Sequence, residues 1–234
     1  MIKVYALLPK RPDISAAQFH EHWSTVHREH ALRIDRLRRY VQAHRIHEDL
    51  EGIATSPYEG VPEVWYDSRE SALGQQEDPS YTEYAQRDEP NFVDMTGIAW
   101  VHTAERLLRD DLPLEQDTDV AKLLLFVRRA EGTTPEAFAE RWPAVAADLA
   151  AGTQVRRSAM ATTLAAQYTE DEPTYDGVLE LWWPDLDELR AGWAAHGPAL
   201  LDGLAEVADV DRCRAHVAYE LRVIWPGPAR TELP

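Results

Sequence analysis

The sequence predicts an α+β fold in which two copies of a β-α-β-β-α-β unit pack against each other within one chain. The first observation is an internal repeat, because residues 58–65 (YEGVPEVW) recur as residues 175–182 (YDGVLELW). The second is that upstream positions stay in register, as Lys3 with Lys122 and Trp23 with Trp142 do. The predicted domains are residues 1–109 and 119–226. A polar linker at 110–118 joins them, and a tail at 227–234 follows.

The first strand and helix of each copy follow from local patterns. Residues 2–8 are mostly apolar and precede Pro9, which is typical of a buried strand. Ser15 in the first copy and Thr134 in the second are good helix N-caps. The apolar stripes expected on these helices are Phe19, Trp23, Val26 and His30 in the first copy, and Phe138, Trp142, Val145 and Leu149 in the second.

The remaining strands complete each unit. Residues 38–46 and 156–164 alternate as second strands, residues 63–66 and 179–183 form third strands, and residues 98–108 and 213–224 form fourth strands. An acidic, alanine-containing helical segment follows each third strand. This order is the ferredoxin-like split βαβ arrangement.

Composition excludes several classes of function. The formal net charge of −17 opposes binding to nucleic acid and to anionic membrane surfaces, which requires clustered Lys and Arg. No apolar run long enough to span a membrane and no signal-peptide pattern is present, so we expect a cytoplasmic protein. The single cysteine, Cys213, cannot form an internal disulfide. Self-association into a homodimer is compatible with the sequence but not required by it.

The predicted ligand site is a cavity between the two sheets. Alternation along the strands places Val41, Ala43 and Val64 toward the helices and a second set toward the opposite sheet. That second set consists of Tyr40, Gln42, His44, Glu63, Trp65, Trp100 and His102. A face lined by large aromatic and a few polar side chains is typical of a site for a small hydrophobic ligand.

Four segments carry a resemblance to a known family. They are residues 19–27 (FHEHWSTVH), 37–42 (LRRYVQ), 63–65 (EVW) and 88–94 (DEPNFVD). On these segments the chain resembles the EthD-like family of the dimeric α+β barrel superfamily, in a tandem form where one chain supplies both halves. In the second copy Ala146 replaces His27, and Ala159 stands where Tyr40 would be. The resemblance therefore implies an active first half and a degenerate second half.

The candidate catalytic residues are His27, His44, His102 and Glu63. A neutral imidazole can take a proton from a carbon acid, and a carboxylate buried beside a tryptophan can act as an acid. Structural hydrogen bonding is the alternative role for each of them. The candidate substrate-binding residues are Trp23, Tyr40, Gln42, Trp65 and Trp100, with packing in the core as their alternative role.

No cofactor is expected. The histidine pairs His27 with His30 and His44 with His47 lack the carboxylate or cysteine that would complete a metal motif. No glycine-rich nucleotide-binding motif is present either. The sequence therefore predicts neither a metal nor a nucleotide cofactor.

These observations favour a cofactor-independent enzyme that binds a small cyclic or polyketide-like molecule and carries out lyase-type proton transfer, namely decarboxylation, dehydration or cyclisation. One alternative is an oxidoreductase, either a cofactor-free monooxygenase or a haem-handling protein with a histidine as axial ligand. A second alternative is a non-catalytic accessory protein that binds the same ligand. The resemblance does not choose among them, since it implies relatives linked to ether degradation, an oxygenase, and cofactor-free decarboxylases or dehydratases.

Overall fold

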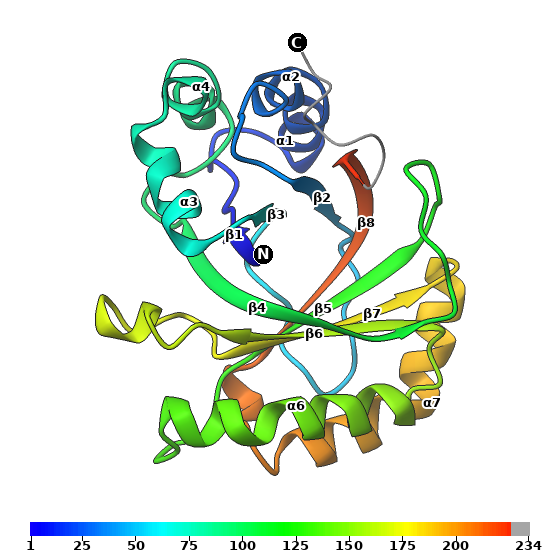
Figure 1. Cartoon of the computed structure of the whole chain (residues 1–234). Helices are drawn as coiled ribbons and strands as arrows, with labels where there is room; N and C mark the ends of the chain where they lie inside the picture. The colour runs from blue at the N-terminus through cyan, green and yellow to red at the C-terminus, as the bar shows by residue number, and fades with distance from the viewer. Residues whose placement is uncertain (226–234) are drawn as a thin grey trace.

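The computed structural model describes residues 1–225, in which eight strands close into one antiparallel barrel (Figure 1). The predicted tail at 227–234 lies outside the described residues. The first half supplies β1 (Ile2–Leu7), β2 (Arg39–Arg45), β3 (Gly60–Tyr66) and β4 (Ala99–Asp110). The second half supplies β5 (Ala121–Val127), β6 (Arg157–Thr163), β7 (Gly177–Trp183) and β8 (Arg214–Ile224). The predicted α+β barrel within one chain is confirmed.

The two halves are joined by backbone hydrogen bonds. The strand order around the barrel is β1-β3-β2-β8-β5-β7-β6-β4, so β2 pairs with β8 and β4 pairs with β6. Two separate sheets packed face to face are therefore the wrong description, because pairing at the seams leaves no free strand edge. The expectation that each half is a ferredoxin-like domain of its own stays a prediction, as do the domain boundaries.

Helices cover the outside of the barrel in two unequal layers (Figure 1). Over the second half, α6 (Pro135–Gly152) and α7 (Leu186–Leu204) are long and pack a continuous core. Over the first half the layer is broken into α1 (Ala16–His22), the π-helical turn η1 (Trp23–His27), α2 (Arg28–Ala31), α3 (Arg69–Leu73), η2 (Gly74–Glu77), α4 (Pro79–Thr82), α5 (Ala85–Asp88) and η3 (Glu89–Asn91). The remaining short turns are η4 (Gln167–Thr169) and η5 (Val210–Arg212). None of the described helices is both long enough and apolar enough to cross a membrane.

The π-helical turn changes which side chains the first helix buries. Ser15 caps α1 as predicted, by accepting a hydrogen bond from the backbone N–H of Gln18. A π turn contains more residues than an α turn, so the buried positions after Trp23 are His27 and Ala31. The predicted stripe is therefore wrong at Val26, whose surface is 46% exposed.

Packing between helix and sheet explains why the repeat has a glycine at positions 60 and 177. A Cβ atom on Gly60 would lie 2.5 Å from the ring of Trp23, and one on Gly177 would lie 2.7 Å from the ring of Trp142. The indole rings thus rest on the strand backbone in both halves, where only glycine leaves room.

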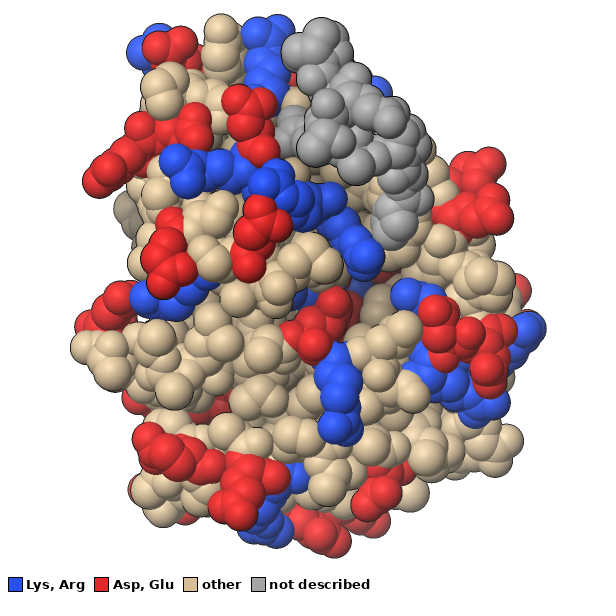
Figure 2. Space-filling view, in the orientation of Figure 1, with Lys and Arg blue, Asp and Glu red and all other residues tan. Residues whose placement is uncertain are grey.

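Charged and apolar side chains occupy most of the interior of the barrel. Lys3 Nζ lies 2.7 Å from Glu63 and 2.5 Å from Glu180, while Lys122 Nζ lies 2.6 Å from Glu63 and also contacts Glu180. The full barrel charge cluster comprises Lys3, Lys122, Arg222, Glu63, Glu105, Glu180 and Glu220. The expected ligand cavity between the two halves is therefore largely occupied by ion pairs and packed apolar groups, and what remains is a pocket of about 80 Å³ whose walls include Glu63, Trp65, Glu105 and Trp182. On the outer surface, Figure 2 shows basic and acidic side chains interspersed over the face in view.

Candidate active site

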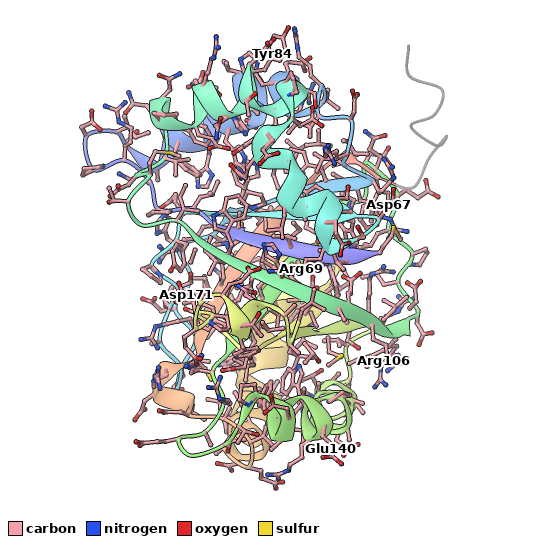
Figure 3. All side chains as sticks on the ribbon, turned by 60° about the vertical axis from the view of Figure 1, so that its left-hand side comes forward. Asp67, Arg69, Tyr84, Arg106, Glu140 and Asp171 are labelled. Atoms are coloured by element: carbon pink, nitrogen blue, oxygen red, sulfur yellow. The ribbon has the colours of Figure 1, made fainter. Side chains whose placement is uncertain are left out.

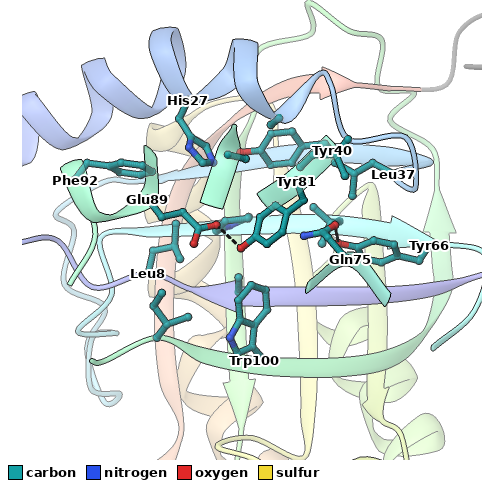
Figure 4. A pocket seen from close by; sticks show the side chains of 17 residues that line it. Leu8, His27, Leu37, Tyr40, Tyr66, Gln75, Tyr81, Glu89, Phe92 and Trp100 are labelled. Carbon is teal, nitrogen blue, oxygen red and sulfur yellow. Dashed lines mark hydrogen bonds between the residues drawn. The ribbon is translucent and has the colours of Figure 1, made fainter. Parts of the chain in front are cut away.

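A small apolar cavity lies between the broken helical layer and the outer face of the first-half strands (Figure 4). Its volume is about 50 Å³, and its walls include His27, Tyr40, Tyr81, Glu89, Phe92 and Trp100. A cavity of this size holds a few water-sized groups in the conformation described. A ring can therefore enter only if the short helices around it move outward.

A wider pocket of about 510 Å³, which we call the vestibule, adjoins this cavity. The two share the side chains of Tyr66, Gln75, Tyr81, Glu89, Ile98 and Trp100. The vestibule also reaches Arg69 on α3, His102 on β4 and Glu170 from the second half. The cavity and the vestibule together form a site with an apolar inner end and a more polar entrance.

His27 is oriented by a buried carboxylate. Its Nδ1 lies 3.0 Å from Asp88 Oδ2, and both side chains are largely buried. Because an ionised carboxylate only accepts hydrogen bonds, Nδ1 carries the ring proton and Nε2 keeps its lone pair. Burial lowers the pKa of His27 below its ordinary value, although Asp88 acts in the opposite direction. His27 is therefore a neutral imidazole at pH 7, with Nε2 on the edge of the ring opposite Asp88.

Asp88 is held by more than one donor. Its Oδ1 lies 2.8 Å from His22 Nε2 and accepts a hydrogen bond of 3.0 Å from Asn91 Nδ2. Burial raises the pKa of Asp88, but the hydrogen bonds from His27, Asn91 and His22 outweigh it and leave the pKa below its usual range. The carboxylate thus stays ionised and fixes both the tautomer and the orientation of His27.

Tyr40 is prepared to donate a hydrogen bond. Its hydroxyl oxygen accepts one bond from Trp23 Nε1 at 3.0 Å and another from Gln42 Nε2 at 2.9 Å. Both acceptor positions are then used, so the phenolic proton remains available for a ligand. Burial raises the pKa of Tyr40, which keeps this proton in place at neutral pH. Figure 4 shows the Tyr40 side chain on the wall of the cavity beside His27.

Glu89 supplies a second titratable group to the cavity. Tyr81 donates a hydrogen bond of 2.7 Å to Glu89 Oε1 (Figure 4). Burial raises the pKa of Glu89 to about 7, even though the bond from Tyr81 lowers it. A carboxyl group with this pKa can hold a proton at neutral pH and donate it.

The structure brings together only some of the predicted site residues. His27, Tyr40 and Trp100 line the cavity, and His102 lines the vestibule. Trp23 and Gln42 lie behind Tyr40 and hold its hydroxyl group, so they support the site without lining it. The predicted orientation of β2 is inverted, since Val41 and Ala43 face the barrel interior while Tyr40, Gln42 and His44 face the helices. Trp100 and His102 also face outward, against expectation.

His44 belongs to a hydrogen-bonded group outside the cavity. Its Nδ1 lies 2.9 Å from His20 Nδ1, its Nε2 lies 3.0 Å from Gln42 Oε1, and its ring packs on Trp23 at 4.5 Å between centroids. Burial lowers the pKa of His44 to about 3. These contacts place it in a supporting position behind Gln42.

Glu63 and Trp65 are separated from His27 by the sheet. Trp65 Nε1 donates to Glu105 Oε2 at 2.9 Å inside the barrel, and Glu63 is bound by Lys3 and Lys122. Burial raises the pKa of Glu63 to about 7 despite the two lysines. Three cations face four carboxylates in the cluster, so a proton retained by Glu63 balances the charge.

Sequence reasoning missed the roles of Asp88, Glu89 and Tyr81. Asp88 and Glu89 stand in the segment 88–94 that carried the family resemblance, but no chemistry was assigned to them. A signal was present, because acidic residues there accompany the histidines of the first half. Several short helices separate His27 from Asp88 in the sequence. The spacing of the two residues could therefore not show that their side chains meet.

A haem does not fit beside His27. The Nε2 lone pair is chemically suited to an axial ligand. However, His27 lines only the cavity of about 50 Å³ and not the larger vestibule, so a porphyrin would require a much larger outward movement of the short helices than a small ring requires. No step through haem is derived for this site.

Comparisons with known proteins give a family and a fold. The chain matches the family model described as EthD domain over residues 11–96 and again over 130–212. No curated protein matches the chain by sequence. The crystal structure of an anthrone oxidase-like protein has a TM-score of 0.66 at 10% identity, covering 95% of this chain and 93% of that chain.

Two further solved structures share the fold at lower similarity. A provisionally named monooxygenase from Fusobacterium nucleatum subsp. nucleatum has a TM-score of 0.55 at 9% identity, covering 94% of this chain and 91% of that chain. A provisionally named chlorite dismutase has a TM-score of 0.53 at 7% identity, covering 95% and 96%. At these identities the likeness shows a common fold.

Proposed function

Because the chain belongs to the EthD domain family, as segments 19–27 and 88–94 predicted, we propose that it is an oxidoreductase acting on a small cyclic carbon acid without a resident cofactor. The observation that carries the proposal is the pairing of His27 with Asp88 beside the Tyr40 hydroxyl in one apolar cavity. This arrangement supplies a base for a C–H proton and a donor for the oxygen that becomes negatively charged. The names of the structural neighbours, anthrone oxidase-like and monooxygenase, support oxidation as the outcome.

In the proposed reaction the substrate is an enolisable ring ketone such as anthrone. His27 Nε2 removes a proton from the ring methylene, and Tyr40 donates a hydrogen bond to the ketone oxygen as it becomes an enolate. The carbanion transfers one electron to dioxygen, and the two radicals combine to form a peroxide. Protonated His27 returns its proton to the peroxide, and the neutral ring then removes the second C–H proton as the O–O bond breaks, which gives the new ketone and hydroxide. His27 passes this second proton to the hydroxide to form water. One CH₂ and one O₂ are thereby converted into one C=O and one H₂O.

A second candidate, lyase-type dehydration or cyclisation, is favoured by Glu89 alone. A carboxyl group with a pKa of about 7 in the same cavity as His27 makes an acid and base pair. Such a pair can protonate a leaving hydroxyl group while His27 removes a proton. This reaction would need Glu89 and would not consume oxygen.

The test is aerobic turnover of anthrone with an oxygen electrode and quinone absorbance. We expect the protein to consume one O₂ per quinone formed, the His27→Gln variant to fall to the buffer rate, and Glu89→Gln to retain turnover. His196→Gln on α7 is the matched control, because it changes a partly exposed histidine far from the cavity. If the protein turned over a hydroxylated ring ketone without oxygen uptake, the lyase reaction would replace oxidation as the function of the site. Tight binding of ring ligands with no turnover of any would support an accessory protein instead.

A further inference from the structure

The vestibule contains a cation whose position the proton-transfer chemistry leaves unexplained. Arg69, the first residue after the N-terminal cap of α3, is the one Lys or Arg among the described residues that line either the vestibule or the inner cavity. Its side chain is 19% exposed, and its Nε atom is buried. A mostly buried arginine in a ligand entrance is suited to recognising an oxyanion, because its planar donors match a carboxylate.

One buried nitrogen of this arginine and one of a histidine that also lines the vestibule have no hydrogen-bond partner in the described part of the chain. They are Arg69 Nε and His102 Nδ1. Both side chains line the vestibule; burial lowers the pKa of His102, the charge of Arg69 lowers it further, and Glu170 acts in the opposite direction. A neutral imidazole can carry its proton on Nδ1 and donate it. Two side chains that line the vestibule thus each carry a donor that no described protein group satisfies, which is costly unless a ligand completes it.

The carboxylate of Glu170 already occupies part of the space beside Arg69 in the vestibule. Glu170, from the loop that follows η4 in the second half, lies 2.5 Å from Arg69 Nη2. The Glu170 side chain is 56% exposed, and ion pairs of this kind contribute little to stability. Figure 3 shows Arg69 on α3 and the neighbouring Asp171 in this loop, with β4 passing between α3 and the loop. Glu170 can thus leave Arg69 at small cost when a ligand carboxylate enters.

The loop itself stays anchored when Glu170 moves. Gln167 Oε1 accepts a hydrogen bond of 2.9 Å from the backbone N–H of His102, and Gln167 Nε2 donates one of 2.7 Å to the carbonyl oxygen of Trp100. The second half, which has no counterpart of His27, therefore contributes a wall and an exchangeable carboxylate to the site of the first half.

We propose that Arg69 and His102 form a carboxylate subsite in the vestibule, and that the substrate is a cyclic carbon acid with a carboxylate on the part of the ring remote from His27. The placement of the ring in the inner cavity rests on the proposed function. Glu170 occupies the subsite in the free protein and competes with the substrate carboxylate. The subsite selects among ring ligands and takes no part in the proton transfer.

The experiment compares two probes that differ only in the carboxylate, namely naphthol and the corresponding hydroxynaphthoic acid, by calorimetric titration at pH 7. A charge-assisted arginine contact predicts that the acid binds roughly tenfold or more tightly than naphthol. Arg69→Gln should remove this difference and leave naphthol binding unchanged. Glu170→Gln should tighten binding of the acid severalfold and leave naphthol unchanged, because the competing carboxylate is gone.

The matched control is Arg106→Gln, which changes an exposed arginine on β4 outside the vestibule (Figure 3) and should alter neither affinity. Equal affinities of the two probes, equal losses for both probes in Arg69→Gln, or weaker binding of the acid by Glu170→Gln would each overturn the subsite. Binding is measured with His27→Gln as well, where the preference for the acid should persist. The carboxylate subsite and the oxidation of anthrone are therefore tested independently. The binding preference can be found when anthrone is not oxidised, and it can be absent when anthrone is oxidised.

Discussion

His27 Nδ1 lies 3.0 Å from Asp88 Oδ2, and this contact joins the π-helical turn η1 to the end of α5. It fixes the tautomer of the imidazole and leaves Nε2 as the basic atom of the cavity. The equivalent helix in the second half, α6, is regular and carries Ala146 at the corresponding position. The site therefore depends on a local break in helix geometry that only one half possesses.

Asp88→Asn should lower kcat by about a thousandfold or more, because an amide no longer fixes the proton on Nδ1 and His27 can adopt the unproductive tautomer. KM should change little, since the cavity walls stay the same. Steady-state kinetics with anthrone measure both constants. His22→Gln, which removes the other histidine bonded to Asp88, should cost far less, and a loss as large as that of Asp88→Asn would argue against the assigned base.

Tyr40→Phe should lower kcat by about a hundred- to a thousandfold while the protein remains folded, because the variant keeps the ring and loses only the donor to the enolate oxygen. Tyr66→Phe is the control, since the Tyr66 hydroxyl group donates its proton to Gln75, whereas the Tyr40 hydroxyl group accepts from Trp23 and Gln42 and keeps its proton for a ligand. If Tyr40→Phe keeps full activity, the developing charge is stabilised elsewhere.

The pH dependence of kcat/KM follows from the lowered pKa of His27. The reactive form is the neutral ring, so the rate should rise with pH through one ionisation below the ordinary histidine pKa of about 6.5 and then reach a plateau. Oxidation should show no second ionisation, whereas a reaction that needs protonated Glu89 should slow again above about pH 7. A rate that falls as pH rises from acid to neutral would contradict a histidine base.

The barrel charge cluster predicts opposite effects at two equivalent positions of the repeat. The pKa of Glu63 is raised from 4.5 to about 7, so the folded protein holds a proton that the unfolded chain has released. The contribution of Glu63 to stability is thus present below pH 4.5 and is lost as the pH rises through about 7. Glu63→Gln should therefore match or exceed the stability of the parent at about pH 8.

Glu180→Gln should instead destabilise the fold by about 3–5 kcal/mol, because Lys3 and Lys122 lose a fully buried carboxylate. Denaturant unfolding of both variants at two pH values measures the difference. Activity gives an independent check, since Glu63→Gln should still oxidise anthrone. Equal destabilisation by the two substitutions would show that the cluster does not retain a proton at Glu63.

The strands and the absence of a counterpart of His27 in the second half could be predicted from the sequence. The location of the cavity could not. Both faces of β2 are buried, so alternation of Tyr40, Val41 and Gln42 does not reveal which face meets the helices. Glu63 was predicted as a polar group of the ligand site, whereas it belongs to the barrel charge cluster, where it lies 2.7 Å from Lys3 Nζ.

The helical layer was harder to predict for a related reason. Hydrophobic periodicity assumes α-helical spacing, and the π turn at Trp23–His27, where the site forms, departs from that spacing. Short helical turns such as α5 and η3 have too few residues for a periodic signal. The sequence alone therefore could not place Asp88 and Glu89 at the site.

The most direct test of the central claim is hydrogen–deuterium exchange at the methylene carbon of anthrone, followed by mass spectrometry under anaerobic conditions in D₂O. Without oxygen the reaction stops after proton abstraction, so exchange reports the action of His27 alone. We predict that the parent protein accelerates exchange well above the buffer rate and that folded His27→Gln returns it to that rate. Equal exchange by the parent and by His27→Gln, or no acceleration by the parent, would contradict His27 as the base.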